Sequence, residues 1–311
     1  MIDHSLLIGF GGPTKPEEVW PFIERLTRGM RIPEPRLKEV ARHYEVTGGF
    51  SPYNQHAQRL CQKVTEALYA GGVTLPVFLG MRNWQPFLPD VIRQIKDRGL
   101  RHGLGIVLAP HRSEVSFGRY VASVEEAKQE LSAPEIQVEY LKPWYDHPLF
   151  IEAQADRVRE IWDEAYSRDG AGVRLVFTAH SIPVEVAKNS SYEEGIHLSS
   201  RRVAEALGVK DWSVAYQSRS GSPGQPWLEP DLLAVIPQLK KEGKDCLVVV
   251  PIGFLFDHTE VLYDLDMQAQ EAAHREGLRF FRASTVMDHP KFVQMFAELI
   301  KEQVCVHGAR R

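Results

Sequence analysis

RLVFTAHSIP at residues 174–183 and DCLVVVPIGFLFDHTE at residues 245–260 are the two stretches that decide the fold. Each contains an unbroken apolar run rich in valine and leucine, which is typical of a strand buried on both faces of a parallel sheet. Each run ends at proline, glycine or polar residues, and a longer stretch of mixed polarity follows. Both stretches therefore predict a buried parallel strand with polar residues at its carboxyl end.

The same alternation runs along the whole chain of 311 residues. We expect strands at 5–10, 75–79, 105–108, 137–141, 174–178, 212–217, 245–251 and 278–282. We expect helices at 17–27, 57–69, 87–98, 116–131, 151–167, 192–206, 231–241, 261–275 and 290–304. Strands that alternate with helices predict parallel sheets covered on both faces. Two such runs predict two doubly wound α/β domains.

The break between the domains is expected at residues 142–146, a corner rich in proline and aromatic residues. This places an amino-terminal α/β domain at 1–143 and a carboxyl-terminal one at 144–287, with a last helix at about 288–305 that can pack back on the first. Two domains also suit a chain of this length. In such folds ligands bind at the carboxyl ends of strands, at a switch point or between domains.

The composition is that of a globular protein that does not bind nucleic acid. Hydrophobic residues make up 43% of the chain and charged residues 25%, and the formal net charge is -4. A nucleic-acid-binding face must be basic enough to neutralise phosphates, so nucleic acid is not an expected partner. The longest apolar run, at about 246–256, is too short to span a bilayer, and the first residues lack the pattern of a signal peptide.

Cysteine usage indicates a reducing compartment. Cys61, Cys246 and Cys305 are far apart in the sequence and form no CxxC pair. We therefore expect neither a disulfide framework nor a four-thiolate iron–sulfur cluster, and we predict a cytoplasmic protein.

His180 and Glu260 are the candidate chemical groups that follow the two strands quoted above. An imidazole can bind Fe²⁺, Zn²⁺ or Co²⁺ or act as a base near neutral pH, although a lone histidine more often only caps a loop. Glu260, Asp264 and Gln268 share one helix face, which offers an oxygen-rich path for a cation or for protons. The alternative is a solvated helix whose acidic first turn suits the helix dipole.

The motifs AHSIP at 179–183 and GFLFDHTEVLYDLD at 253–266 are much more specific together than apart, and in them the chain resembles the ferrochelatase family. Further family-like segments follow in order along nearly the whole chain: GGP at 11–13, GGFSP at 48–52, GMRNWQPF at 80–87, LAPH at 108–111, WYD at 144–146, QS at 217–218 and PWL at 226–228. Each segment is weak alone, and the ordered set is strong.

The resemblance implies two flavodoxin-like, chelatase-type domains with a porphyrin cleft between them. It implies a lyase that inserts Fe²⁺ into a porphyrin in haem biosynthesis, with His180 and Glu260 as the catalytic and metal-binding pair and Asp264 on a path for protons or metal. The porphyrin contacts would be Phe10, Thr27, His43, Tyr44, Ser51 and Tyr120. It also implies a monomer without a permanently bound cofactor or iron–sulfur cluster, for which Fe²⁺ and porphyrin are the substrates.

Within the family, LAPH, WYDHP and the short carboxyl terminus resemble the branch that metallates coproporphyrin III, which has four propionates, rather than protoporphyrin IX, which has two. Phe10 stands where that branch often has a tyrosine that can ligate product iron. Thr27 and His43 stand where the family has arginines that meet propionates, and Gln268 replaces an acidic residue.

An arginine-rich stretch offers compensation for these departures. It contains Arg25, Arg28, Arg31, Arg36 and Arg42. Arginine pairs bidentately with carboxylates, so these arginines could receive the propionates at positions slightly different from those of the family arginines. The alternative is a solvated basic helix and loop.

Three other functions stay open from the sequence. The substrate can be protoporphyrin IX in place of coproporphyrin III. A chelatase of similar fold that loads cobalt or nickel into a tetrapyrrole precursor would use the same residue types. A carrier of porphyrin or haem without catalysis would explain Phe10 and Gln268 as the decay of an active site.

Overall fold

The computed structural model describes residues 1–169, 172–220 and 224–308, which form two compact units. The first unit combines residues 1–109 and 115–142 with the carboxyl-terminal stretch from Met287, and the second consists of residues 110–114 and 143–286. Each unit is a parallel sheet between two layers of helices, which confirms the doubly wound α/β fold class. Along the described residues, no helix is both long enough and apolar enough to cross a membrane.

The first sheet has the strand order β2-β1-β3-β4, with every pair parallel. Its strands are β1 (His4–Gly9), β2 (Val77–Met81), β3 (His102–Val107) and β4 (Gln137–Tyr140). All six residues of β1 are buried, because β1 is a central strand with helices over both faces. This explains why the sequence there is a continuous apolar run rather than an alternating one.

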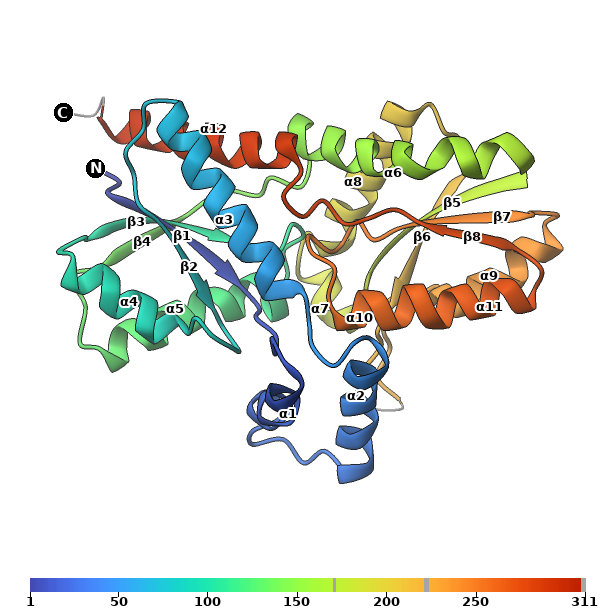
Figure 1. The fold of residues 1–311 in the computed structure, drawn as a ribbon, viewed down its shortest axis with the longest axis horizontal. Coiled ribbons are helices and arrows are strands. Elements are labelled where there is room, and N and C mark those ends of the chain that lie inside the picture. The colour runs from blue at the N-terminus through green and yellow to red at the C-terminus, as the bar shows by residue number, and fades with distance from the viewer. Residues whose placement is uncertain (170–171, 221–223, 309–311) are drawn as a thin grey trace. The chain divides into compact units, whose positions relative to one another are not determined.

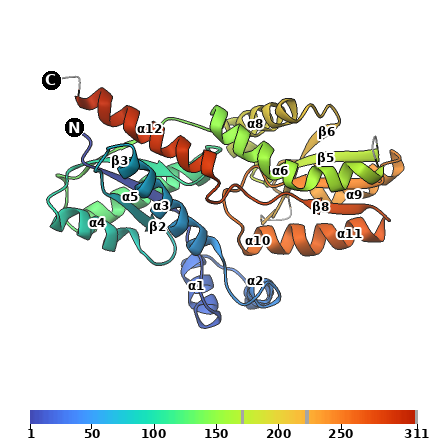
Figure 2. The same cartoon turned by 45° about the horizontal axis from the view of Figure 1, so that its top comes forward.

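Helices cover both faces of the first sheet (Figure 1). On one face, α4 (Leu88–Asp97) and α5 (Arg119–Glu130) pack on Leu6 and Ile8 of β1. On the other face lie α3 (Tyr53–Ala70) and α12 (Pro290–Gly308), which pack against each other although they are distant in sequence, as Figures 1 and 2 show.

Between β1 and α3 the chain forms a helical hairpin that the sequence only partly predicts. It consists of a 3₁₀ turn (Pro16–Glu18), α1 (Val19–Leu26) and α2 (Glu34–Val46). Helix α2 was not among the expected helices, because none of its residues is buried and its apolar residues form no clear stripe. A further short turn of π type spans Glu114–Gly118 ahead of α5.

The second sheet repeats the topology of the first, in the order β6-β5-β7-β8. Its strands are β5 (Val173–His180), β6 (Trp212–Gln217), β7 (Cys246–Val250) and β8 (Arg279–Arg282). One helix layer contains α6 (Pro148–Asp169) and α8 (Tyr192–Leu207), which pack together. The other contains α9 (Leu232–Lys241) and the helical segment that follows β7, while the short α7 (Val184–Lys188) follows β5.

The helix expected at 261–275 is interrupted by a π-helical segment. The structure has α10 (Thr259–Val261), a π-helix η4 (Leu262–Ala269) and α11 (Gln270–Arg275). A buried seam of Val261, Leu265, Ala269 and Ala273 recurs every four residues and packs on β5 and β7. Glu260, Asp264 and Gln268 each precede a residue of this seam, so the wider π-helical turn aligns them along one side.

Helix α12 should be essential to the first unit, because Phe292 and Phe296 are completely buried there and their ring centroids lie 4.8 Å apart. We expect Phe296→Ala to lower the free energy of unfolding by about 3–5 kcal/mol, since it removes a large buried ring and leaves a cavity. Urea denaturation would measure this, with the exposed Lys301→Ala on the same helix as control. Equal effects of the two variants would contradict the assigned packing.

Candidate functional site

The site predicted by the two quoted motifs forms at the carboxyl edge of the second sheet. His180 is the last residue of β5, and Glu260 lies in α10, after the loop that leaves the neighbouring strand β7. The chain after β5 continues to the α8 side of the sheet, and the chain after β7 continues to the α9 side (Figures 1 and 2). Such a switch point leaves room for a ligand between the two departing loops.

A glycine allows the β7 loop to approach β5 closely at this point. A Cβ atom on Gly253 would lie 2.6 Å from Ala179 Cβ and 2.8 Å from Ala179 Cα. The Gly253 N–H also donates to the Thr178 carbonyl at 3.0 Å. The loop that leads to Glu260 is therefore fixed directly beside the residue that precedes His180.

Two hydrogen bonds fix the orientation of His180. Its Nδ1 lies 2.5 Å from the Ser181 carbonyl oxygen; because a carbonyl can only accept, Nδ1 must carry the ring proton. Its own carbonyl accepts from the hydroxyl of Tyr192 at 2.9 Å. The ring is thus held in the tautomer whose Nε2 lone pair is available to a metal or a proton.

The lone pair of His180 lies close to the carboxylate of Glu260. Nε2 is 3.9 Å from Glu260 Oε2, and the two side chains are 30% and 53% exposed. This separation is too long for a hydrogen bond. Zinc makes bonds of about 2.1 Å to imidazole nitrogen and carboxylate oxygen, so a small movement of either side chain would let both atoms bind one ion. The pair can therefore share one first-row metal ion or exchange a proton through a ligand.

Asp264 lies deeper than Glu260 and is held by the end of β6. Gln217 Nε2 donates to Asp264 Oδ2 at 3.4 Å, and Ser218 Oγ makes a short hydrogen bond to the same oxygen. Burial raises the pKa of Asp264 to about 6, and the negative charge of Glu260 adds to this, against the opposing effect of the hydrogen bond from Ser218. Asp264 is thus a carboxyl group that can carry a proton near neutral pH.

Sequence reasoning did not identify Gln217 and Ser218 as side chains of the site. The signal was present, because Gln217 ends a strand that neighbours β5 and Ser218 follows it, and ligands bind at the carboxyl ends of adjacent strands.

The start of α10 is capped by a histidine that lies next to the site. His258 Nδ1 accepts from the Val261 N–H at 3.2 Å, and its ring packs edge-on against Phe254 with 5.1 Å between centroids. Burial lowers the pKa of His258, although the nearby Glu260 opposes this. This neutral ring fixes the first turn of the helix that presents Glu260.

Among the residues that the structure describes, no third metal-ligating side chain accompanies the pair. Gln268 is exposed at the far end of the same helix side. Across the part of the chain that the structure describes, no group of three or more His, Cys, Asp or Glu side chains is arranged to hold a metal ion. A metal at His180 and Glu260 would therefore depend on further ligands from its substrate or from water.

The six residues predicted to contact porphyrin all lie in the first unit. Phe10 follows β1 and donates its N–H to the Tyr53 hydroxyl at 2.9 Å. Thr27 ends α1, and its hydroxyl donates to the Ile23 carbonyl at 2.8 Å. His43 and Tyr44 lie on α2, where they are partly exposed.

Ser51 and Tyr120 complete this set, and both are almost completely buried, with 3% and 6% of their surface exposed. Tyr120 belongs to the apolar core between the first sheet and α5, against which Phe10 also packs. The hydroxyl groups of Ser51 and Tyr120 therefore offer little surface to a ligand. The assignment of all six residues as porphyrin contacts stays a prediction.

Two features outside the site have structural explanations. His111 is 2% exposed, and its Nε2 lies 3.0 Å from Ser199 Oγ. Burial lowers its pKa to about 3, as expected of a packed, neutral ring.

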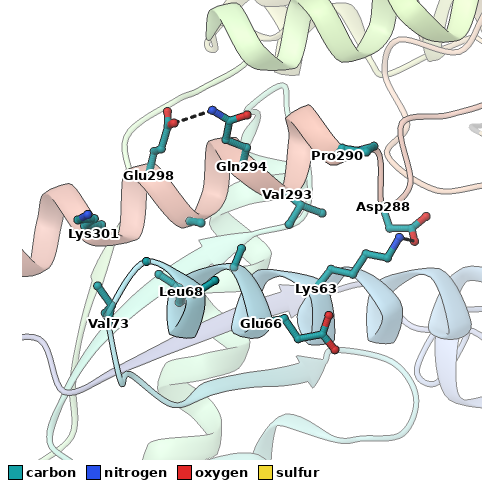
Figure 3. Close-up of a pocket in the computed structure, with 14 residues that line it drawn as sticks. Lys63, Glu66, Leu68, Val73, Asp288, Pro290, Val293, Gln294, Glu298 and Lys301 are labelled. Atoms are coloured by element: carbon teal, nitrogen blue, oxygen red, sulfur yellow. Dashed lines mark hydrogen bonds and ion pairs between the residues drawn. The ribbon is translucent and has the colours of Figure 1, made fainter.

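A cavity of about 610 Å³ lies between α3 and α12 (Figure 3), bordered by the Lys63–Asp288 ion pair at 2.6 Å. None of the predicted site residues lines this cavity.

The buried carboxyl of Asp264 should make stability depend on pH. Below about pH 4 the group is protonated in both the folded and the unfolded chain, but between about pH 4 and pH 6 only the folded chain keeps the proton. The contribution of Asp264 to the free energy of unfolding should therefore fall across this window. Asp264→Asn has no proton to lose, so its stability relative to wild type should rise by about 1–3 kcal/mol from pH 4 to pH 7.

Urea denaturation at several pH values would measure this difference. Asp163→Asn, at an exposed position of α6, is the control because it removes no buried carboxyl group. A relative stability of Asp264→Asn that stays constant or falls with pH would contradict the assigned environment.

The comparisons with known proteins identify the family of this chain. The model of the family described as Ferrochelatase matches residues 5–304. The ferrochelatase of Rhodopirellula baltica is 39% identical over 97% of this chain and 86% of its own. The coproporphyrin III ferrochelatases of Mycolicibacterium smegmatis and Nocardia farcinica are each 38% identical, over 98% and 100% of this chain and 90% of their own.

One solved structure resembles this chain in fold, at low sequence identity. The cobalt complex of the sirohydrochlorin chelatase SirB from Bacillus subtilis subspecies spizizenii has a TM-score of 0.57 and 15% sequence identity, over 97% of this chain and 95% of that one. Its fold agrees with the two parallel α/β units described above. The family model and the curated relatives span nearly the full length of the chain, and the chain belongs to the ferrochelatase family.

Proposed function

We propose that this protein inserts Fe²⁺ into coproporphyrin III, with His180 and Glu260 as the catalytic pair and the metal-binding groups. The observation that carries the proposal is the 3.9 Å separation between His180 Nε2 and Glu260 Oε2 at the switch point of the second sheet. Membership of the ferrochelatase family supplies the reaction class that this pair would serve.

Metal insertion requires the removal of water from the iron and of two protons from the pyrrole nitrogens. The Nε2 lone pair of His180 is available to replace a water on the iron or to accept a pyrrole proton, because Nδ1 donates to the Ser181 carbonyl. Glu260 lies within reach of the same ligand. A proton released there can pass to Asp264, whose burial raises its pKa to about 6, because a carboxyl group with such a pKa can both take up and release protons near neutral pH. We assign the roles of His180 and Glu260 jointly.

Coproporphyrin III is the proposed porphyrin because curated relatives along nearly the whole chain are named coproporphyrin III ferrochelatases. The arginine-rich hairpin supports this choice. Its five arginines, Arg25, Arg28, Arg31, Arg36 and Arg42, are all exposed. Arg25 lies over the ring of Phe87 at 4.4 Å, and Arg36 pairs with Glu39 at 2.6 Å. Exposed guanidinium groups suit four propionates better than two.

The proposal extends to the porphyrin contacts and to the state of the protein. Phe10, Thr27, His43, Tyr44, Ser51 and Tyr120 are proposed to border the porphyrin, with no ligand to product iron from Phe10. The enzyme is proposed to be a cytoplasmic monomer that uses Fe²⁺ as a substrate and holds no permanent cofactor. In the part of the chain that the structure describes, Cys61, Cys246 and Cys305 form no disulfide, which supports a reducing compartment.

His180→Ala should lower kcat for iron insertion by at least a hundredfold, because the Nε2 lone pair is lost while the porphyrin contacts proposed in the first unit remain. The dissociation constant for coproporphyrin III, from fluorescence titration, should change by less than about threefold. His197→Ala, an exposed histidine on α8, is the control and should retain activity. A wild type that binds porphyrin but turns over no metal would favour a carrier instead.

The choice of porphyrin and metal is tested by parallel rates. We expect kcat/KM to be at least tenfold higher with coproporphyrin III than with protoporphyrin IX, because the added propionates meet exposed arginines. Fe²⁺, Co²⁺ and Ni²⁺ should be compared on both porphyrins and on sirohydrochlorin. Faster turnover of protoporphyrin IX would reverse the substrate assignment, and a preference for cobalt or nickel with sirohydrochlorin would replace the proposed function by that of a different chelatase.

A further inference from the structure

Arg282, the last residue of β8, joins two carboxylates on either side of the catalytic helix segment. Its Nη1 and Nη2 donate to the two carboxylate oxygens of Asp257 at 3.1 and 3.2 Å. Nη2 also donates to Asp266 Oδ2 at 2.8 Å, and Nε makes a short hydrogen bond to Asp266 Oδ1. One guanidinium group thus makes a two-oxygen contact with each carboxylate.

These contacts lie in a mostly buried environment that keeps them ordered. The Arg282 side chain is 12% exposed and that of Asp257 is 16% exposed, while Asp266 is 35% exposed. The hydroxyl of Thr285, which is completely buried, donates to Asp257 Oδ1 at 2.9 Å. Burial works against the charge of Arg282, but the hydrogen bonds and the charges of Asp266 and Asp257 outweigh it, so the pKa of Arg282 is raised.

The positions of the two carboxylates connect Arg282 to the site. Asp257 lies three residues before Glu260, and Asp266 lies two residues after Asp264 in the π-helix η4. The guanidinium group therefore fixes both ends of the segment that presents Glu260 and Asp264. Without a cation between them, Asp257 and Asp266 would repel each other and lose most of their hydrogen bonds.

We propose that Arg282 is a positioning residue for metal insertion, which sets the places of Glu260 and Asp264 by holding Asp257 and Asp266 together. The proposal rests on the proposed function. Only a forked, planar cation can serve both carboxylates at two oxygens each, so lysine should not replace this arginine. Displacement of a catalytic group by about 1 Å can lower a rate by about a hundredfold.

The test compares Arg282→Lys with a matched arginine at the opposite end of the same sheet. Arg174, near the start of β5, is 18% exposed and also pairs with two carboxylates, Asp211 at 2.7 Å and Glu242 at 2.8 Å. Arg282→Lys should lower kcat for iron insertion by tenfold to a hundredfold while KM for coproporphyrin III stays within twofold. Arg174→Lys should leave both constants within twofold, even where it lowers the melting temperature equally.

Hydrogen–deuterium exchange provides a readout that does not need activity. Arg282→Lys should increase amide exchange at least threefold in peptides that cover residues 257–269, and Arg174→Lys should not. Asp266→Asn, which keeps the contact of Arg282 with Asp257, is the second variant and should give a smaller loss of kcat, about threefold to tenfold. If Arg282→Lys does not fold, the loss of kcat in Asp266→Asn still tests the positioning role.

The outcomes separate the two proposals. Equal losses of kcat in Arg282→Lys and Arg174→Lys, or unchanged exchange at 257–269, would overturn the positioning role. An inactive wild type would overturn the proposed function. In that case faster exchange at 257–269 would still support Arg282 as the residue that positions Glu260 and Asp264, and unchanged exchange would remove it.

Discussion

Strand β5 is hydrogen-bonded to β6 along one side and to β7 along the other, and the rest of the site depends on this double pairing. The helices after β5 and after β7 pack on opposite faces of the sheet, so the two loops must separate at the carboxyl end. Close packing excludes ligands almost everywhere else in such a unit. His180 lies at this carboxyl edge, where the two loops separate, and Gly253 lets the loop that carries Glu260 begin beside it.

The carboxyl groups around His180 have different surroundings although they lie on one helix. Glu260 is about half exposed, whereas Asp264 is mostly buried against the end of β6 and has a raised pKa. Environments that differ in this way allow two acidic residues to take different roles in one reaction. Glu260 lies at the exposed start of the helix, whereas Asp264 lies one turn further along the same side, where Gln217 and Ser218 contact it.

The sequence predicts well what depends on continuous burial. The strands at 174–178 and 245–251 are evident because both of their faces are covered. His180 lies just after the first, and Glu260 lies beyond the loop that follows the second. It does not predict α2, whose helix buries no residue, nor the π-helical turn, which depends on how η4 packs rather than on residue type. The contacts of Ser218 with Asp264, and of Arg282 with Asp257 and Asp266, join residues that are distant in sequence. Only the register of neighbouring strands brings them together, and no local pattern encodes that register.

The return of α12 to the first unit has a consequence for the order of folding during synthesis. Residues 143–286 are contiguous and contain nearly all of the second unit, whereas one helix layer of the first unit is incomplete until α12, with Phe292 and Phe296, is made. Domains fold as units as the chain emerges from the ribosome. The half of the protein that is translated first is therefore completed last, and until then the surface of α3 that packs against α12 is uncovered.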